Sequence, residues 1–305
     1  MSSTFFQNVP SDTHEWEQAA IAARVLGRSP KFFKRFQSGS EVTQKQFLLY
    51  RTICLAIEVP DRLRISKFNY FRLRDAERIL RESITFQNYI LAISLGQTLG
   101  LGDFGLVLEQ QLEIREVLED PIKMQLKLTE FDESIVNTSL IYFLQALTRT
   151  IPPDTPNHPR CKWRLKKIAL RAHFGNVNGQ NHGFVAITDG QMQDITTGRI
   201  KAIGQCKKGR RQNHTPQVDM QEASELVALI MEYPDGRLQR VMISQDGDEI
   251  YITFAQYGTN WVKHINCQSV LRPGFMILRR FGPWKIGDPA DMKHLATIML
   301  TIILG

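Results

Sequence analysis

The stretch Ile187-Thr188-Asp189-Gly190, followed by Arg199-Ile200-Lys201-Ala202-Ile203-Gly204-Gln205-Cys206-Lys207, decides the fold of this chain. Both apolar runs end in polar side chains, the first in a carboxylate and the second in a Gln-x-Lys pair. Because alternate residues of a strand share one face, Gln205 and Lys207 are expected to point the same way, while small and apolar residues face a packed layer. The pattern predicts two strands that end at one shared polar site.

These residue types suit a metal-dependent phosphodiesterase. Asp189 supplies a hard oxygen ligand of the kind that divalent cations prefer. Lys207 can orient the attacking water or stabilise charge on the phosphate. Two plainer interpretations stay open: Asp-Gly is ordinary turn chemistry, and Lys207 also belongs to a basic run.

The first part of the chain, residues 1–125, predicts a helical region. Apolar residues recur there at helical spacing, and glycine or proline follows each segment. The predicted helices are residues 15–26, 47–57, 73–95 and 106–118.

Residues 126–305 predict a domain in which helices and strands alternate. A leucine-rich stripe at helical spacing predicts a core-facing helix at 133–150, and Asp246-Gly247 is a hairpin signal. The further predicted elements are strands 167–173, 183–189, 199–207, 238–244, 249–257 and 276–281 and helices 217–233 and 290–304. The order α-β-β-β-α-β indicates an α+β (α/β-like) class, with a mixed sheet flanked by helices.

Several of these segments resemble a known family. They are Thr188-Asp189-Gly190, Gly198-Arg199-Ile200, Gln205-Cys206-Lys207, residues 216–223, Ser244-Gln245-Asp246 and Phe281-Gly282-Pro283-Trp284. They resemble a group of uncharacterised fungal proteins that is similar to the PD-(D/E)XK nuclease superfamily. The resemblance covers roughly Glu133 to the C-terminus. It implies a restriction-endonuclease-like αβββαβ core and a divalent-metal-dependent nuclease with little sequence specificity.

The resemblance also implies residue roles. Asp189 matches the metal-binding Asp, Gln205 the Glu/Gln position and Lys207 the Lys of the same strand, and these three form the expected catalytic set. With Asp189 and Gln205, Glu133 on the first core helix would bind Mg²⁺ or Mn²⁺. An acidic residue in a first helical turn is also favoured by the helix dipole alone. The chain has Gln205 where the group usually has Glu, which removes one negative charge from the cation site. The alternative is therefore a catalytically inactive module that binds nucleic acid or protein.

Polar residues around the site predict further contacts. From Arg199 to Arg211 there are six basic residues and no acidic one, which suits a polyanion such as DNA or RNA and equally an ordinary solvated surface. The residues expected to bind nucleic acid are Arg199, Lys208, Arg210 and Arg211. On the helix at 217–233, superfamily members carry polar residues that support the site, which points to Gln221 or Glu222. A solvated face is the other interpretation for Glu222 and its neighbour Glu225.

Composition places the chain among ordinary globular proteins. Of 305 residues, 43% are hydrophobic and 23% charged, with a formal net charge of +7. The four cysteines form no Cys-x-x-Cys pair, and neither a secretory signal nor an apolar run long enough to span a bilayer is found, so we expect an intracellular protein, nuclear or cytoplasmic. A basic stretch from Arg62 to Arg81 fits a solvated helix face or a nucleic-acid surface. The N-terminal helices could instead bind a protein partner. A Rossmann-type cofactor enzyme is disfavoured because no Gly-x-Gly-x-x-Gly turn follows a strand.

Overall fold

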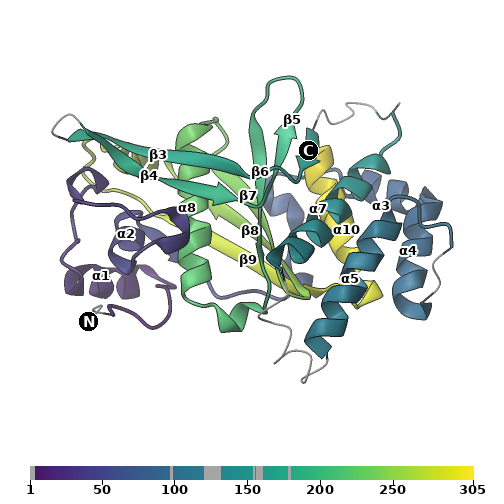
Figure 1. The fold of residues 1–305 in the computed structure, drawn as a ribbon. Coiled ribbons are helices and arrows are strands. Elements are labelled where there is room, and N and C mark those ends of the chain that lie inside the picture. Colours follow the sequence, from purple (N-terminus) through teal and green to yellow (C-terminus); the bar gives the residue numbers. More distant parts are fainter. Residues whose placement is uncertain (1–3, 97–98, 120–131, 154, 156–160, 178–179) are drawn as a thin grey trace.

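A mixed seven-stranded sheet with strand order β1-β9-β8-β7-β6-β5-β2 forms the centre of the molecule (Figure 1). The pairs β6–β7 and β1–β9 are parallel, and the other neighbours are antiparallel. The strands of this sheet are β1 (Thr52–Cys54), β2 (Cys161–Arg164), β5 (Gly190–Asp194), β6 (Ile200–Lys207), β7 (Gln239–Asp246), β8 (Glu249–Gln256) and β9 (Met276–Lys285). The computed structural model describes residues 4–96, 99–119, 132–153, 155, 161–177 and 180–305. The expectation of an α+β protein with a mixed sheet is confirmed.

Helices cover both faces of this sheet. The α-helices are α1 (Thr13–Ala22), α2 (Gln44–Leu49), α3 (Leu73–Glu82), α4 (Ile84–Leu95), α5 (Phe104–Glu119), α7 (Glu133–Arg149), α8 (Gln217–Glu232), α9 (Thr259–Ile265) and α10 (Pro289–Leu304). The short 3₁₀ helices are η1 (Pro30–Phe32), η2 (Gly39–Glu41), η3 (Pro60–Arg62), η4 (Ile65–Phe68) and η5 (Arg211–Asn213). One hydrophobic cluster joins α3, α4, α5, α7 and α10 to one face of the sheet, and a second joins α1, α2, α8 and α9 to the other.

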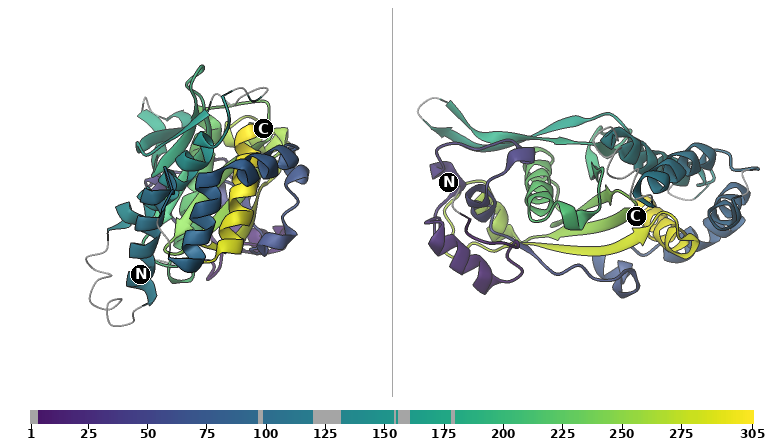
Figure 2. Two further views of the ribbon diagram at one scale, coloured as in Figure 1. Left: turned by 90° about the vertical axis from the view of Figure 1, so that its right-hand side faces the viewer. Right: turned by 60° about the horizontal axis from the view of Figure 1, so that its bottom comes forward.

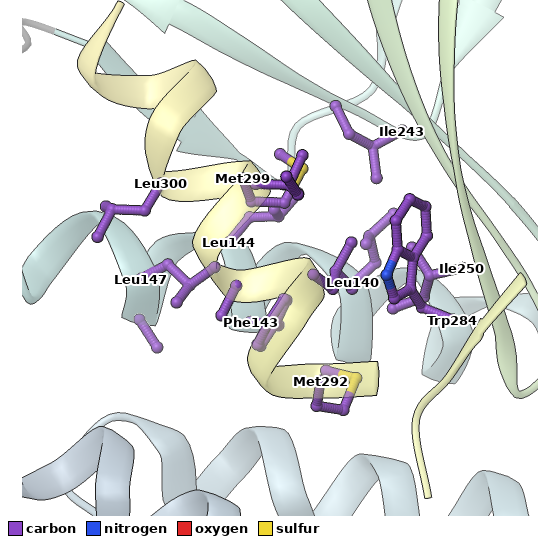
Figure 3. Packing of buried hydrophobic residues seen from close by; sticks show 14 of the residues in the cluster. Leu140, Phe143, Leu144, Leu147, Ile243, Ile250, Trp284, Met292, Met299 and Leu300 are labelled. Atoms are coloured by element: carbon purple, nitrogen blue, oxygen red, sulfur yellow. The ribbon is translucent and has the colours of Figure 1, made fainter. Parts of the chain in front are cut away.

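The first cluster is centred on the contact between α7, α10 and the sheet (Figure 3). Leu140, Leu144 and Leu147 of α7 lie in this cluster together with Met299 of α10, and Trp284 joins it near the end of β9. All of these side chains are fully buried, as the leucine stripe predicts. Burying one such side chain contributes about 1.5–3 kcal/mol, so this contact is a large part of what holds α7 on the sheet.

Two predicted strands lie outside the main sheet. β3 (Ile168–Val177) and β4 (Gln180–Thr188) correspond to the predictions 167–173 and 183–189, but they pair with each other as a separate two-stranded hairpin. The main sheet uses β2 and β5 instead, which were not predicted as strands. Both are only four or five residues long, too short for alternation to stand out in the sequence.

Two helix predictions need correction. The predicted helix 73–95 is divided at Ser83, whose extended backbone ends α3 and whose Oγ accepts from the Phe86 N–H to cap α4. The predicted helix 47–57 is wrong beyond residue 49. Arg51 has a φ of 52°, and the chain then pairs with β9 as strand β1.

The N-terminal helices are not gathered in one place. Figure 2 shows in its right-hand view that α1 and α2 (purple) lie at the opposite end of the molecule from α3 to α5 (blue to teal). Each group shares a hydrophobic cluster with elements of the C-terminal half. The expected boundary between residues 125 and 126 lies outside the described residues. Within the described residues, none of the helices is long and apolar enough to cross a membrane.

Candidate metal and phosphate site

Asp189 lies at the point where the chain leaves the β3–β4 hairpin and enters the main sheet. Its backbone N–H donates to the Gly204 carbonyl at 3.0 Å. Its side-chain Oδ2 accepts from the Cys206 N–H, also at 3.0 Å. The carboxylate therefore adds one hydrogen bond to the β5–β6 ladder, just before the first residue of β5. Asp189 is 5% exposed. This hydrogen bond gives Asp189 a structural role in addition to the catalytic role that the sequence predicts.

Two facing glycines let α7 lie close above this corner. Gly190 and Gly204 are partners in the β5–β6 ladder. A Cβ on Gly190 would lie 2.4 Å from Ile141 Cδ1, so only glycine leaves room for that side chain. One turn earlier on α7, Asn137 donates from Nδ2 to the Asp189 carbonyl at 2.9 Å. The glycine of the Asp-Gly pair thus allows α7 to pack close to the sheet.

The second oxygen of Asp189 is occupied by a lysine. Lys167 Nζ lies 3.0 Å from Asp189 Oδ1, and this hydrogen bond raises the pKa of Lys167. The Lys167 side chain is 63% exposed. An exposed lysine is held weakly, because water competes for its charge. The carboxylate is therefore positioned by buried contacts on one side and covered by an exposed cation on the other.

Lys207 pairs with Glu133 across the same corner. Their Nζ and Oε1 atoms are 3.8 Å apart. Burial raises the pKa of Glu133; Lys207 opposes this and Asp189 adds to it, so the three charges lie within electrostatic reach of one another. The recorded ion pairs nevertheless join Lys207 to Glu133 and Asp189 to Lys167. A direct pair between Asp189 and Lys207 is not recorded.

Gln205 is buried and faces α8. It shares strand parity with Ile203, which packs into the α8 cluster. Its Nε2 makes one long bond, 3.4 Å, to the Cys206 carbonyl, and its Oε1 has no donor within the described residues. A buried amide oxygen without a donor is costly, so this atom is a candidate ligand atom.

Glu225 is a site residue that the sequence interpretation missed. It is 1% exposed on α8; its Oε1 accepts from Gln221 Nε2 at 2.9 Å, and its Oε2 has no recorded donor. Burial raises its pKa well above the usual value; Asp189 adds to this rise and Lys207 opposes it. The available signal was a Gln-x-x-x-Glu pair inside a helix that is apolar on nearly every side.

Glu222 serves a buried ionic network. Its carboxylate contacts Arg211, and it pairs with Arg280 Nη2 at 2.6 Å. Asp219 joins both arginines, at 3.0 and 2.8 Å. The interpretation of Glu222 and Glu225 as a solvated face is wrong, because both are buried. Burial acts to raise the pKa of Glu222, but Arg211 and Arg280 outweigh it and lower the pKa to about 2.

Asp246 ends β7 inside the same network. Burial raises its pKa to about 7, although Arg211 acts to lower it. Arg211 Nε lies 2.7 Å from Asp246 Oδ2, but neither atom makes a hydrogen bond of good angle, so the contact is an ion pair without directional bonding. Among the described residues, Asp246 Oδ1 also has no hydrogen-bond donor. In the sequence, Asp246 belongs to a turn signal and to one of the segments that carry the family resemblance, and neither predicts a buried ionic role.

The residues predicted to bind nucleic acid have different environments in the structure. Arg211 is 2% exposed and held by acids, which is incompatible with a contact to a phosphate backbone in this conformation. Arg210 forms a two-bond pair with Asp248 at 2.7 and 2.8 Å. Lys208 is half-buried, and Arg199 is exposed beside the Pro234 carbonyl. Arg199 is thus the member of this set that is most open to solvent.

Among the described residues, no group of three or more His, Cys, Asp or Glu side chains is placed to hold a metal ion. Comparison with protein-family models, with curated proteins and with solved structures found no match. Function must therefore be argued from the geometry of the chain itself.

Proposed function

We propose that this chain is a divalent-metal-dependent phosphodiesterase acting on nucleic acid, built on a PD-(D/E)XK-like core. The order α7-β2-β5-β6-α8-β7 supports this proposal. The four strands lie in the order β2-β5-β6-β7, with two antiparallel pairs followed by a parallel one, and α8 connects the parallel pair. That arrangement supports the assignment of the αβββαβ core that the sequence resemblance implies.

One observation carries the proposal: near Asp189 and Lys207, buried oxygens of Gln205 and Glu225 have no hydrogen-bond donor among the residues that the structure describes. Hard oxygen atoms left without a partner in a buried site fit a divalent cation. Asp189, Gln205 and Glu225 would hold Mg²⁺ or Mn²⁺, with Glu133 as a further acid at the edge of the site. Such a cation would polarise a phosphate oxygen and help to ionise water.

The protein side chains have separate tasks in the proposed reaction. Water adds to phosphorus, one P–O ester bond breaks, and the departing oxygen takes up a proton. Lys207 is placed to stabilise negative charge that develops on the phosphate, because its partner Glu133 lies at 3.8 Å and holds it only loosely. Arg199 and Lys208 would attract the backbone without reading bases, which predicts salt-sensitive binding.

A second candidate function is a binding module that has lost hydrolysis. Two observations favour it: Lys167 occupies one Asp189 oxygen, and the neutral amide of Gln205 replaces a carboxylate. Both lower the negative charge available to a cation. In this case nucleic acid would bind at the same corner without cleavage.

Cleavage assays on the full chain separate these candidates. Single- and double-stranded DNA and RNA would be incubated with Mg²⁺ or Mn²⁺, beside Asp189→Asn, Lys207→Ala and Glu225→Gln. Loss of an electrostatic group at the reacting phosphate is expected to reduce the rate about 10²–10³-fold. Lys201→Ala is the matched control, because Lys201 lies on the same strand away from the corner. Binding without cleavage by the wild type would establish the second candidate, and cleavage that survives all three site variants would reject the first.

A further inference from the structure

A basic cleft lies at the end of the sheet opposite the Asp189 corner. Its volume is about 330 Å³, and it is formed by η3, η4 and the adjoining ends of β8 and β9. Four cationic side chains line it, together with one acid and a buried aromatic floor. They are Arg62, Arg64, Lys67 and Arg279, with Glu58 and Phe281.

The cleft is separate from the candidate phosphodiesterase site. β8 begins at Glu249, level with Asp246, and ends at Gln256 in the cleft wall. Seven residue steps (256 − 249) of a strand span about 23 Å. Phe281 belongs to the hydrophobic cluster on the α7 face, whereas Gln205 faces α8. One bound phosphate could not contact both places.

The cleft residues differ from the basic residues that follow them in sequence. In α3, Arg72 is paired with Asp75 at 2.8 Å and Arg78 with Glu82 at 3.2 Å. Intrahelical pairs of this kind neutralise a solvated helix face. In the basic stretch from Arg62 to Arg81, Arg72 and Arg78 are therefore each paired with an acid, unlike the cationic residues of the cleft.

The charges in the cleft have little internal compensation. Arg64 donates from Nη1 to a backbone carbonyl at 3.0 Å, and within the described residues no ion pair is recorded for Arg62, Lys67 or Arg279. The single carboxylate, Glu58, leaves a local excess of positive charge. Like charges gathered around one cleft repel, and a bound anion removes that repulsion.

We propose that this cleft binds the phosphate group of a phosphate ester. The planar guanidinium fork matches phosphate oxygens in pairs, and three arginines converge on one opening. A cleft of about 330 Å³ also leaves room for the group that carries the phosphate. The ester is either a small phosphorylated molecule or one unit of a nucleic-acid backbone, and both share the chemistry that the cleft recognises.

The test is a calorimetric titration of the full chain with each of three ligands: inorganic phosphate, a nucleoside monophosphate and a single-stranded oligonucleotide. The double variant Arg62→Gln/Arg279→Gln should bind each at least about tenfold more weakly, the size expected for lost charged hydrogen bonds. Arg74→Gln is the matched control, because Arg74 is exposed on α3 and does not line the cleft. All these positions are exposed, so thermal unfolding should not change.

The outcomes identify the ligand source as well. Tighter binding of the oligonucleotide than of the mononucleotide, with a salt slope that falls by about 0.7 for each lost contact, indicates a nucleic-acid backbone. Equal binding indicates a small phosphate ester. Inorganic phosphate is titrated without a divalent cation, so that result does not depend on a metal at the Asp189 corner, and failure of the phosphodiesterase proposal would not affect this one. No binding of any of the three, or an equal loss in Arg74→Gln, would overturn it.

Discussion

Lys207 and Asp246 are direct partners in the ladder of the parallel strands β6 and β7. Lys207 reaches the surface of the candidate site, whereas Asp246 is buried among the arginines behind it. Lys207 acts to lower the pKa of Asp246, so the two charges are coupled. The candidate site therefore adjoins a carboxylate that titrates near neutral pH.

The stability that Asp246 contributes should fall as the pH rises from acid towards neutrality. Burial raises the pKa of Asp246 to about 7, above its usual value, so the folded state retains a proton that the unfolded state has lost. The stabilising contribution is present in full below the unfolded pKa and is lost as pH rises through about 7. We expect Asp246→Asn to remove this decline in thermal midpoint between about pH 4 and pH 7. Asp61→Asn, at an exposed carboxylate, should keep the wild-type profile, and an unchanged profile in Asp246→Asn would refute the assignment.

Glu222→Gln should strongly destabilise the fold. The change leaves Arg211 and Arg280 buried with less opposing charge, which typically costs about 3–5 kcal/mol. The lowered pKa of Glu222 also predicts a loss of stability in acid. The stabilisation from Glu222 is present above the unfolded pKa and is lost as pH falls towards about 2. Urea unfolding measures both effects. Glu82→Gln removes the exposed pair with Arg78 and should cost at most about 0.5 kcal/mol.

Gly190→Ala should destabilise through one contact. The added methyl would lie 2.4 Å from Ile141 Cδ1, and overpacking of this kind costs about 1–3 kcal/mol. Ile141→Val removes that methyl group, so the double variant should recover part of the loss. Gly236→Ala is the control, because nothing lies within 4 Å of its added Cβ. Denaturation free energies that are simply additive would argue against the contact.

Lys167→Ala should tighten divalent-cation binding. Lys167 lies 3.0 Å from the Asp189 oxygen that a cation would need, and its removal frees that atom and deletes a repelling charge. Mn²⁺ titration followed by electron paramagnetic resonance measures the change. Lys166→Ala removes an adjacent exposed lysine with no recorded contact to Asp189. Equal effects of the two substitutions would show that only general charge matters.

Cation binding should release protons. The raised pKa of Glu225 favours the protonated carboxyl when the site is free, while a metal ligand must be ionised. We therefore expect Mg²⁺ to displace protons from Glu225, seen as a calorimetric heat that varies with the buffer's ionisation enthalpy. Glu225→Gln should abolish the variation. Binding heats that are the same in every buffer would mean that Glu225 is not a ligand.

Local patterns were enough to predict the elements that bury an apolar stripe. The helix at 133–150 and the strand at 199–207 follow from spacing alone and are confirmed as α7 and β6. β5 was missed because it is short and starts at a glycine. That glycine is needed because it leaves room for the side chain of Ile141. That contact joins residues far apart in the sequence, so no local pattern encodes it.

The polar residues of α8 show a different limit. Glu222 is buried because Arg211 and Arg280 neutralise it, and those partners come from a loop and a distant strand. Sequence spacing suggested a solvated helix face, since acids are rarely buried without partners. The partners become visible only when the fold is known.

The pairing of β1 with β9 sets an order for assembly. Arg51, next to β1, donates to the Gly274 carbonyl, 223 positions later, and the edge of the sheet is completed there. During synthesis the early segment must therefore wait, unpaired, until the distant segment that forms β9 has left the ribosome. A nascent chain stalled before β9 would expose an open strand edge, which makes the time before β9 emerges the interval in which this fold most needs protection from aggregation.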